Sequence, residues 1–157
     1  MNILAIDQAI HTGWATYHSG KIESGVCDFS IKSHESRGMI YVKLEKWLND
    51  ISWDRLEFDL IIYEQTHHRG GAATAISGAM VGIIVSFAEK CNRPVNYTSV
   101  QSLQLKKATT GKGNATKADM MAWFKDKIGR EPISDDEADA MAMLYYAMDK
   151  YQPKGGK

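Results

Sequence analysis

The chain begins with the stretch ILAID, residues 3–7, in which four apolar residues run into an aspartate. A second stretch of this kind, LIIYE, occupies residues 60–64 and ends in a glutamate. Short continuous apolar runs are consistent with buried strands. Ligands of α/β sheets bind at the carboxyl ends of the strands, which is where Asp7 and Glu64 stand. The two stretches therefore predict a sheet with two carboxylates at one edge.

Two further acids, Asp136 and Asp139, lie in the segment SDDEAD, where a helix is predicted to begin. Side chains three residues apart on a helix face the same way, one turn apart. Together with the strand ends they would form one acidic pocket, in which carboxylates repel unless a cation or shared protons compensate them. Oxygen ligands of this kind suit a divalent metal, and such a site indicates phosphate chemistry.

Each of these acids also has a purely structural explanation. Acidic residues at a helix start are favoured by the helix dipole, and Ser134 and Glu137 have the spacing of a capping box. The functional interpretation therefore depends on the acids as a set, because both strand acids stand where α/β proteins usually bind ligands.

Length and composition are typical of a soluble globular domain. The 157 residues are 44% apolar and 24% charged, so we expect one domain over residues 1–151 and a flexible tail over 152–157. Nineteen basic residues balance nineteen acidic ones, so any phosphate-binding surface must be local. Cys27 and Cys91 belong to no C-x-x-C motif or Cys/His cluster, which argues against a zinc site or a disulfide framework. No secretory signal is evident, so we expect a cytoplasmic protein.

Periodicity and turn signals predict a mixed α/β sheet of about five strands, the first three antiparallel, flanked by helices. The predicted strands span about 2–7, 12–18, 21–29, 60–64 and 95–97. The predicted helices span about 35–51, 72–90, 99–107, 116–128 and 135–150, with Ser99 as the cap of the third.

The predicted helix 72–90 belongs to a charge-free stretch, residues 70–88, that is about long enough to cross a bilayer. Its glycines, serines and threonine make it only moderately hydrophobic, so we expect a buried helix and no membrane partner. One side carries large apolar residues and Ala73. The other side carries small residues that permit close approach of its own sheet or of a second copy in a symmetric dimer: Ala75, Ala79, Gly82 and Ser86.

The order of these elements resembles the ribonuclease H-like superfamily, and the motifs resemble the RuvC family of Holliday junction resolvases. The similarity covers nearly the whole chain. It is carried by ILAID (3–7) with TGWA (12–15), YEQ (63–65), LKK (105–107) with TGKGNATK (110–117), and DEADAMA (136–142).

This resemblance implies a crossover junction endodeoxyribonuclease of DNA recombination and repair, acting in a bacterial cell or a phage-infected host. It would cut four-way junctions and other branched DNA as a homodimer. Two Mg²⁺ ions, or Mn²⁺ in their place, would support cleavage to 5′-phosphate and 3′-hydroxyl ends. The implied metal-binding catalytic acids are Asp7, Glu64, Asp136 and Asp139, with Asp7 as the bridging ligand.

The same resemblance implies functions for several basic residues. Lys117 would position the scissile phosphate or stabilise developing negative charge. The DNA backbone would be held by Lys106, Lys107 and Lys112. The segment after Glu64 offers His67, His68 and Arg69, which would stack on bases or contact phosphates, or form an exposed polar turn. Where the family commonly has proline and glycine after its first aspartate, this chain has Gln8 and Ala9, so we expect a different backbone there.

Three other functions fit parts of the pattern. The four acids alone also suit a ribonuclease H acting on RNA/DNA hybrids. A hairpin formed by residues 6–13 would suit an actin-like nucleotide-binding module, although the segment around Gly111 does not match a P-loop. A branched-DNA binding protein without catalysis would use the acids only as structural residues.

Overall fold

The computed structural model describes residues 1–53, 58–66, 70–91 and 93–151. Its centre is one sheet with the strand order β3-β2-β1-β4-β5. Strands β1 (Ile3–Asp7), β2 (His11–His18) and β3 (Lys21–Asp28) form an antiparallel meander. Strands β4 (Leu60–Glu64) and β5 (Asn96–Val100) continue the sheet in parallel with β1. This confirms the predicted mixed sheet of five strands.

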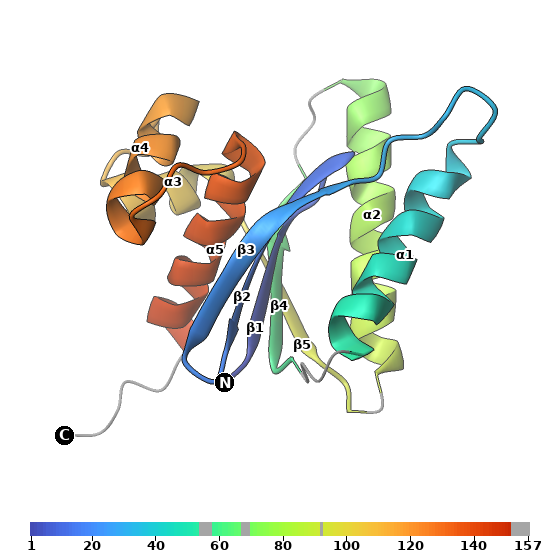
Figure 1. Cartoon of the computed structure of the whole chain (residues 1–157), viewed down its shortest axis with the longest axis horizontal. Helices are drawn as coiled ribbons and strands as arrows, with labels where there is room; N and C mark the ends of the chain where they lie inside the picture. Colours follow the sequence, from blue (N-terminus) through green and yellow to red (C-terminus); the bar gives the residue numbers. More distant parts are fainter. Residues whose placement is uncertain (54–57, 67–69, 92, 152–157) are drawn as a thin grey trace.

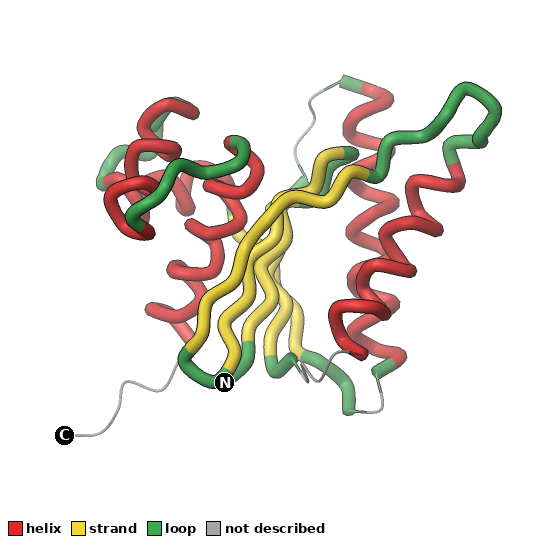
Figure 2. The backbone as a smooth tube through the Cα atoms, viewed as in Figure 1, coloured by secondary structure: helices red, strands yellow, loops and turns green. Residues whose placement is uncertain are grey.

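In the described part of the chain, five helices cover the two faces of the sheet (Figures 1 and 2). Helices α1 (Gly38–Trp53) and α2 (Gly71–Lys90) lie on one face. Helix α5 (Asp135–Tyr151) lies on the other face, with α3 (Ser102–Thr110) and α4 (Lys117–Ile128) packed outside it. The layers are therefore helix, sheet and helix, as expected for an α/β fold.

The apolar runs of β1 and β4 are buried because both faces of the central strands are covered. Ile3, Ala5 and Ile62 contribute to the core beneath α5. Leu4 and Ile61 contribute to the core beneath α1 and α2, and all five side chains are fully buried. Successive side chains along each strand therefore point into opposite cores. Because both faces of these strands are buried, their sequences are apolar throughout and do not alternate with polar residues.

Local sequence signals set the ends of α4. Thr116 and Asp119 form a reciprocal capping box at its start. Gly129 ends it in the left-handed conformation, with φ of 83°. Both ends agree with the prediction to within one residue.

Two predicted helix starts were wrong. Helix α1 begins at Gly38 and not near residue 35, because the Glu35 carboxylate accepts a hydrogen bond from the Lys32 backbone at 2.8 Å and pairs with Lys43 at 3.0 Å. Ser99 does not cap α3, because it pairs within β5 opposite Tyr63 of β4. In both places tertiary and turn contacts replaced the expected helical turn.

The expectation that helix 72–90 is buried holds for one side only. Met80, Ile84, Phe87 and Ala88 are its buried residues, whereas Ala73, predicted for the core, is exposed. The predicted small-residue side faces outward at Ala75, Ala79 and Gly82, and Ser86 is half-buried. By length and composition α2 is the described helix that could cross a membrane, a test that core helices of soluble proteins also pass.

Candidate active site

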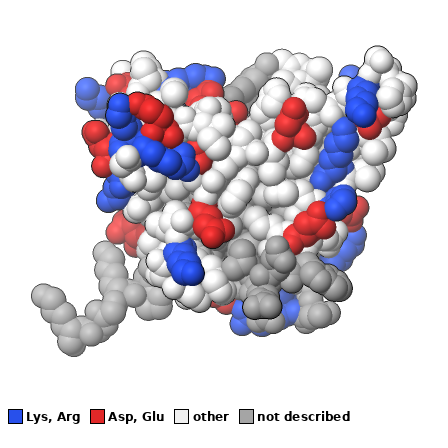
Figure 3. All heavy atoms as spheres, viewed as in Figure 1, with Lys and Arg blue, Asp and Glu red and all other residues white. Residues whose placement is uncertain are grey.

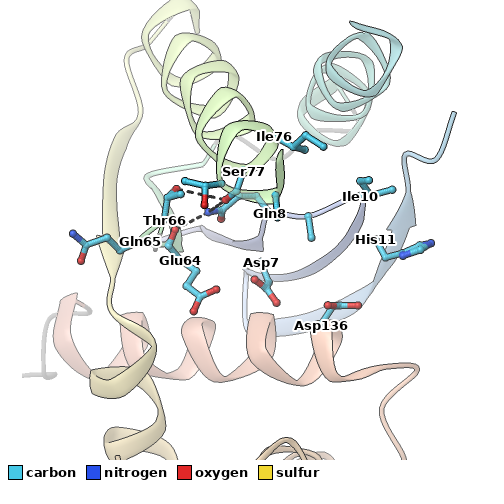
Figure 4. A pocket seen from close by; sticks show the side chains of 13 residues that line it. Asp7, Gln8, Ile10, His11, Glu64, Gln65, Thr66, Ile76, Ser77 and Asp136 are labelled. Carbon is cyan, nitrogen blue, oxygen red and sulfur yellow. Dashed lines mark hydrogen bonds between the residues drawn. The ribbon is translucent and has the colours of Figure 1, made fainter. Parts of the chain in front are cut away.

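Three of the predicted acids line one cavity of about 350 Å³ at the carboxyl edge of the sheet. Asp7 ends β1, Glu64 ends β4, and Asp136 lies in the first turn of α5. In Figure 4 the side chains of Asp7 and Glu64 point toward α5, and Asp136 lies on that helix at its start. The structure therefore brings together acids that lie 57 and 72 residues apart in the chain.

Gly13 allows α5 to approach the sheet at this edge. It is the register partner of Asp7 on β2. A Cβ atom at this position would lie 1.9 Å from the backbone oxygen of Asp136 and 2.8 Å from the nitrogen of Glu137. Both neighbours are backbone atoms, so no side-chain rotation would relieve the clash. The absence of a side chain at Gly13 thus places Asp136 beside Asp7.

Asp139 lies one turn further along α5, and its environment disfavours the charged form. Burial, and then the charge of Glu64, raises the pKa of Asp139 to about 6, while Lys106 acts in the opposite direction. Burial and the neighbouring Asp135 also raise the pKa of Asp136. A strand acid, Glu64, is thus near enough to the α5 acid Asp139 for its charge to raise the pKa of Asp139.

Two of the predicted lysines, Lys106 and Lys117, act on the acids of α5. Lys106 of α3 is close enough to Asp139 to influence its charge. Lys117 begins α4, and its ammonium group pairs with Asp135, directly before Asp136. Lys107 and Lys112 are exposed on α3 and on the loop after it. His67, His68 and Arg69 lie outside the described residues.

Glu137 anchors the start of α5. Its fully buried carboxylate accepts hydrogen bonds from Arg130 at 2.6 and 3.2 Å, from Ser24 of β3 at 2.7 Å and from the Ile133 backbone at 2.6 Å. Burial alone would raise the pKa of Glu137, but these hydrogen bonds outweigh it and hold the pKa below its ordinary value. The network ties the edge strand, the loop before α5 and α5 itself to one another.

The predicted capping box at this helix is only half formed. The Glu137 backbone donates to Ser134 Oγ at 3.4 Å, as the spacing suggested. The Glu137 side chain, however, turns to Arg130 and Ser24 instead of completing the box. The Glu137 carboxylate therefore binds Ser24, 113 residues away, and Arg130 in place of the local backbone.

The turn after Asp7 has its own side-chain support. Thr12 is fully buried, and its hydroxyl donates to the Ala9 carbonyl at 2.5 Å. Gln8 is also buried, and its amide donates to the Glu64 carbonyl at 2.6 Å. The sequence had suggested only that the backbone here would differ from the family pattern; it did not identify Gln8 as a residue of the site.

A divalent metal fits the chemistry of the acids, although they are not arranged as a ready ligand set. Among the described residues, no group of three or more His, Cys, Asp or Glu side chains lies in a metal-holding arrangement. The cavity nevertheless gathers hard oxygen donors, and next to it burial first, and then the charge of Glu64, raises the pKa of Asp139. A bound cation would relieve this repulsion after the side chains reorient.

The two cysteines take part in no disulfide within the part of the chain that the structure describes. Cys27 and Cys91 are free and half-buried. Burial raises the pKa of the Cys27 thiol to about 11, so the thiol stays protonated at neutral pH.

Comparison with known proteins gives a likeness of fold. No family model and no curated protein matches the chain. The solved structure of Thermus thermophilus RuvC superposes with a TM-score of 0.70 at 19% identity, covering 95% of this chain and 97% of that one. The chain has a RuvC-like fold. Thermus thermophilus RuvC in complex with Holliday junction substrate superposes with a TM-score of 0.74, also at 19% identity, covering 95% and 96%.

The RuvC-like fold confirms the resemblance drawn from the four sequence segments. Within this fold, Asp7, Glu64 and Asp136 lie at the sheet edge and the start of α5. Residues that sequence reasoning missed, namely Gln8, Gly13 and Arg130, act through contacts across the fold. Only Gly13 had a signal, because it belongs to the TGWA segment.

Proposed function

We propose that this chain is a divalent metal-dependent endonuclease that cuts branched DNA, four-way junctions above all. The observation that carries the proposal is the convergence of Asp7, Glu64 and Asp136, from three separate elements, on one cavity of a RuvC-like sheet. One of the similar structures is RuvC in complex with Holliday junction substrate, which supports the choice of substrate.

Asp7, Glu64, Asp136 and Asp139 would hold the metal, for which Mg²⁺ is our choice and Mn²⁺ a substitute. When bound, such ions lower the pKa of water and neutralise charge on a phosphate, here in a cut that leaves 5′-phosphate and 3′-hydroxyl ends. Asp139, protonated more readily than an ordinary aspartate, must lose its proton to serve as a ligand.

The lysines would hold the scissile strand. Lys106, beside Asp139, stands where a phosphate near the acids would need a positive charge. Lys117 reaches the phosphate by exchanging its contact with Asp135. Lys107 and Lys112 would contact the flanking backbone. Acidic and basic side chains are interspersed on the face seen in Figure 3, so DNA affinity would depend on these few local charges.

A homodimer is part of the proposal, because a four-way junction is resolved by two opposed cuts that a two-fold dimer supplies. The exposed side of α2 supports it: Ala75, Ala79 and Gly82 form a small-residue surface along the helix. A Cβ atom added at Gly82 meets nothing within 4 Å, so a second helix has room to approach. Ala79→Glu should weaken self-association by at least about tenfold, because it buries a charge at the contact; sedimentation velocity would measure this.

Cleavage of a labelled four-way junction tests the function. Wild type should produce paired nicks near the branch with Mg²⁺ and none with EDTA. Asp7→Asn should lower the cleavage rate by about a thousandfold or more while leaving folding and junction binding intact. A linear duplex is the substrate control.

An RNA/DNA hybrid and ATP, tested beside the junction, separate the proposal from the alternative functions. Cutting of an RNA/DNA hybrid in preference to the junction would replace the resolvase with a ribonuclease H. A folded protein that binds the junction but cuts nothing with either metal would be a binding protein. ATP binding without DNA cleavage would point to a nucleotide-binding module.

A further inference from the structure

Beyond the acids, the cavity holds a buried glutamine with an unusual set of hydrogen bonds. Gln8 follows Asp7 directly, and only 5% of its surface is exposed. Its Nε2 donates to the Glu64 carbonyl oxygen at 2.6 Å and lies 3.4 Å from Ser77 Oγ on α2. Ser77 in turn lies 3.5 Å from the Thr66 hydroxyl, and Figure 4 shows this chain of contacts beside the acids.

The contact to Glu64 falls where the pairing of two strands ends. The β1–β4 register runs from Ile3 opposite Leu60 to Ile6 opposite Tyr63. On its other side, β4 stays paired through Glu64 opposite Val100, and the Gln65 backbone donates to Val100 at 2.8 Å. The Gln8 side chain therefore supplies a link between the two strand ends just beyond the last pair of the β1–β4 register.

The same side chain leaves one buried atom without a partner. Gln8 Oε1 is shielded from solvent and has no hydrogen-bond partner among the described residues. An unsatisfied buried carbonyl lowers stability, so an apolar side chain of equal length would suit the fold about as well. The hydrogen bond from Gln8 Nε2 to the Glu64 carbonyl is therefore a better explanation for the amide than a gain in stability.

We infer that Gln8 is a positioning residue, whose amide holds the Glu64 backbone so that the Glu64 carboxylate stays beside Asp7 in the cavity, where both would hold the metal. This inference rests on the proposed function. Gln8 touches neither metal nor substrate in this role; it acts through Glu64. Residues that orient metal ligands typically change metal affinity by about 10–100-fold when they are removed.

Gln8→Met keeps the length of the side chain and removes both polar atoms. Its melting temperature in EDTA should stay within about 4 °C of wild type, because the loss of the Nε2 contacts to Glu64 and Ser77 is offset by the removal of the unpaired oxygen. Its affinity for Mn²⁺, measured by calorimetry on the folded protein without DNA, should fall about 10–100-fold. Junction cleavage should recover at raised Mg²⁺ concentration, since the acids themselves remain.

Two variants separate this role from a general loss of structure. Ser77→Ala removes the weaker contact and should leave the Mn²⁺ affinity close to wild type. Gln104→Met makes the same exchange at an exposed site on α3 and should change neither affinity nor melting temperature. If Ser77→Ala weakens Mn²⁺ binding as much as Gln8→Met does, the tether to α2 is what matters and the inference is overturned.

The outcomes also distinguish this inference from the proposed function. Equal Mn²⁺ affinity in wild type and Gln8→Met would overturn the role of Gln8 and leave the metal-dependent nuclease standing. A wild-type protein that binds no divalent metal would overturn the nuclease first and the positioning role with it. A reduced affinity in Gln8→Met alone supports both.

Discussion

Helices α5 and α2 cover opposite faces of the same sheet, yet they are used differently. Eight residues of α5 are buried, including the carboxylate of Glu137, although the helix carries five acids. Four of the twenty residues of α2 are buried, although its sequence is almost free of charge. The more polar helix is thus the more buried one.

The comparison shows that burial follows the number of neighbours and not the apolarity of the sequence. Helix α5 packs between the sheet and the α3–α4 pair, so nearly all of its sides meet other elements. Helix α2 meets the sheet and α1 and leaves a small-residue side open. Among the described residues no element covers this side of α2, so it is the surface that a second copy would cover in the proposed dimer.

The largest expected effect is on the free energy of unfolding, when the same Ala→Glu substitution is made once on α5 and once on α2. Ala140 of α5 is fully buried and Ala79 of α2 is exposed. Ala140→Glu places an unpaired charge in the core and should cost at least about 4 kcal/mol of unfolding free energy or prevent folding. Ala79→Glu should change the stability of the monomer by less than about 0.5 kcal/mol. Urea unfolding measures both, and equal effects would remove the contrast between the helices.

A matched glycine pair sharpens the contrast. Gly13→Ala inserts a methyl group against the backbone of α5 and should cost about 3 kcal/mol, because the helix start must shift. Gly82→Ala, on the open side of α2, should stabilise the monomer by about 0.5–1 kcal/mol through helix propensity. Thermal unfolding of dilute protein would show the opposite signs. If the Gly13→Ala variant is as stable as wild type and Asp136 keeps its position, then α5 packs less closely against β2 than described.

The smallest expected effect concerns the pH dependence of stability. The pKa of Asp139 is about 6 in the folded chain and near 3.8 when unfolded, so the folded state binds more protons between these values. Stability in EDTA should therefore fall as the pH rises through this window. Asp139→Asn should remove this fall in stability. At about pH 8 the free energy of unfolding of the variant should exceed that of wild type by about 1–3 kcal/mol.

Urea unfolding in EDTA across the pH range would measure this change, with Asp149→Asn, at the exposed end of α5, as the control. The advantage of Asp139→Asn should vanish by about pH 3.5, where wild type is also neutral at this position. A variant less stable than wild type at about pH 8 would show that the charged carboxylate is stabilised by its surroundings, contrary to the described burial.

Much of the fold was predictable because its signals are local. The runs ILAID and LIIYE predicted two central strands, and the predicted helix of about 116–128 matches α4 to within one residue. The acids were predictable as a set because strand ends meet at one edge of a sheet. Their roles as metal ligands remain predictions.

The sequence by itself determined the order of the elements, the two apolar cores and the residue types at the sheet edge. These follow from periodicity and capping, which depend on neighbours a few residues apart. Only the tertiary structure decided that α2 is half open, that Glu137 bonds Ser24 and that Gln8 bonds Glu64. Those choices join residues 113 and 56 positions apart, and each depends on which buried groups packing brings within hydrogen-bond distance.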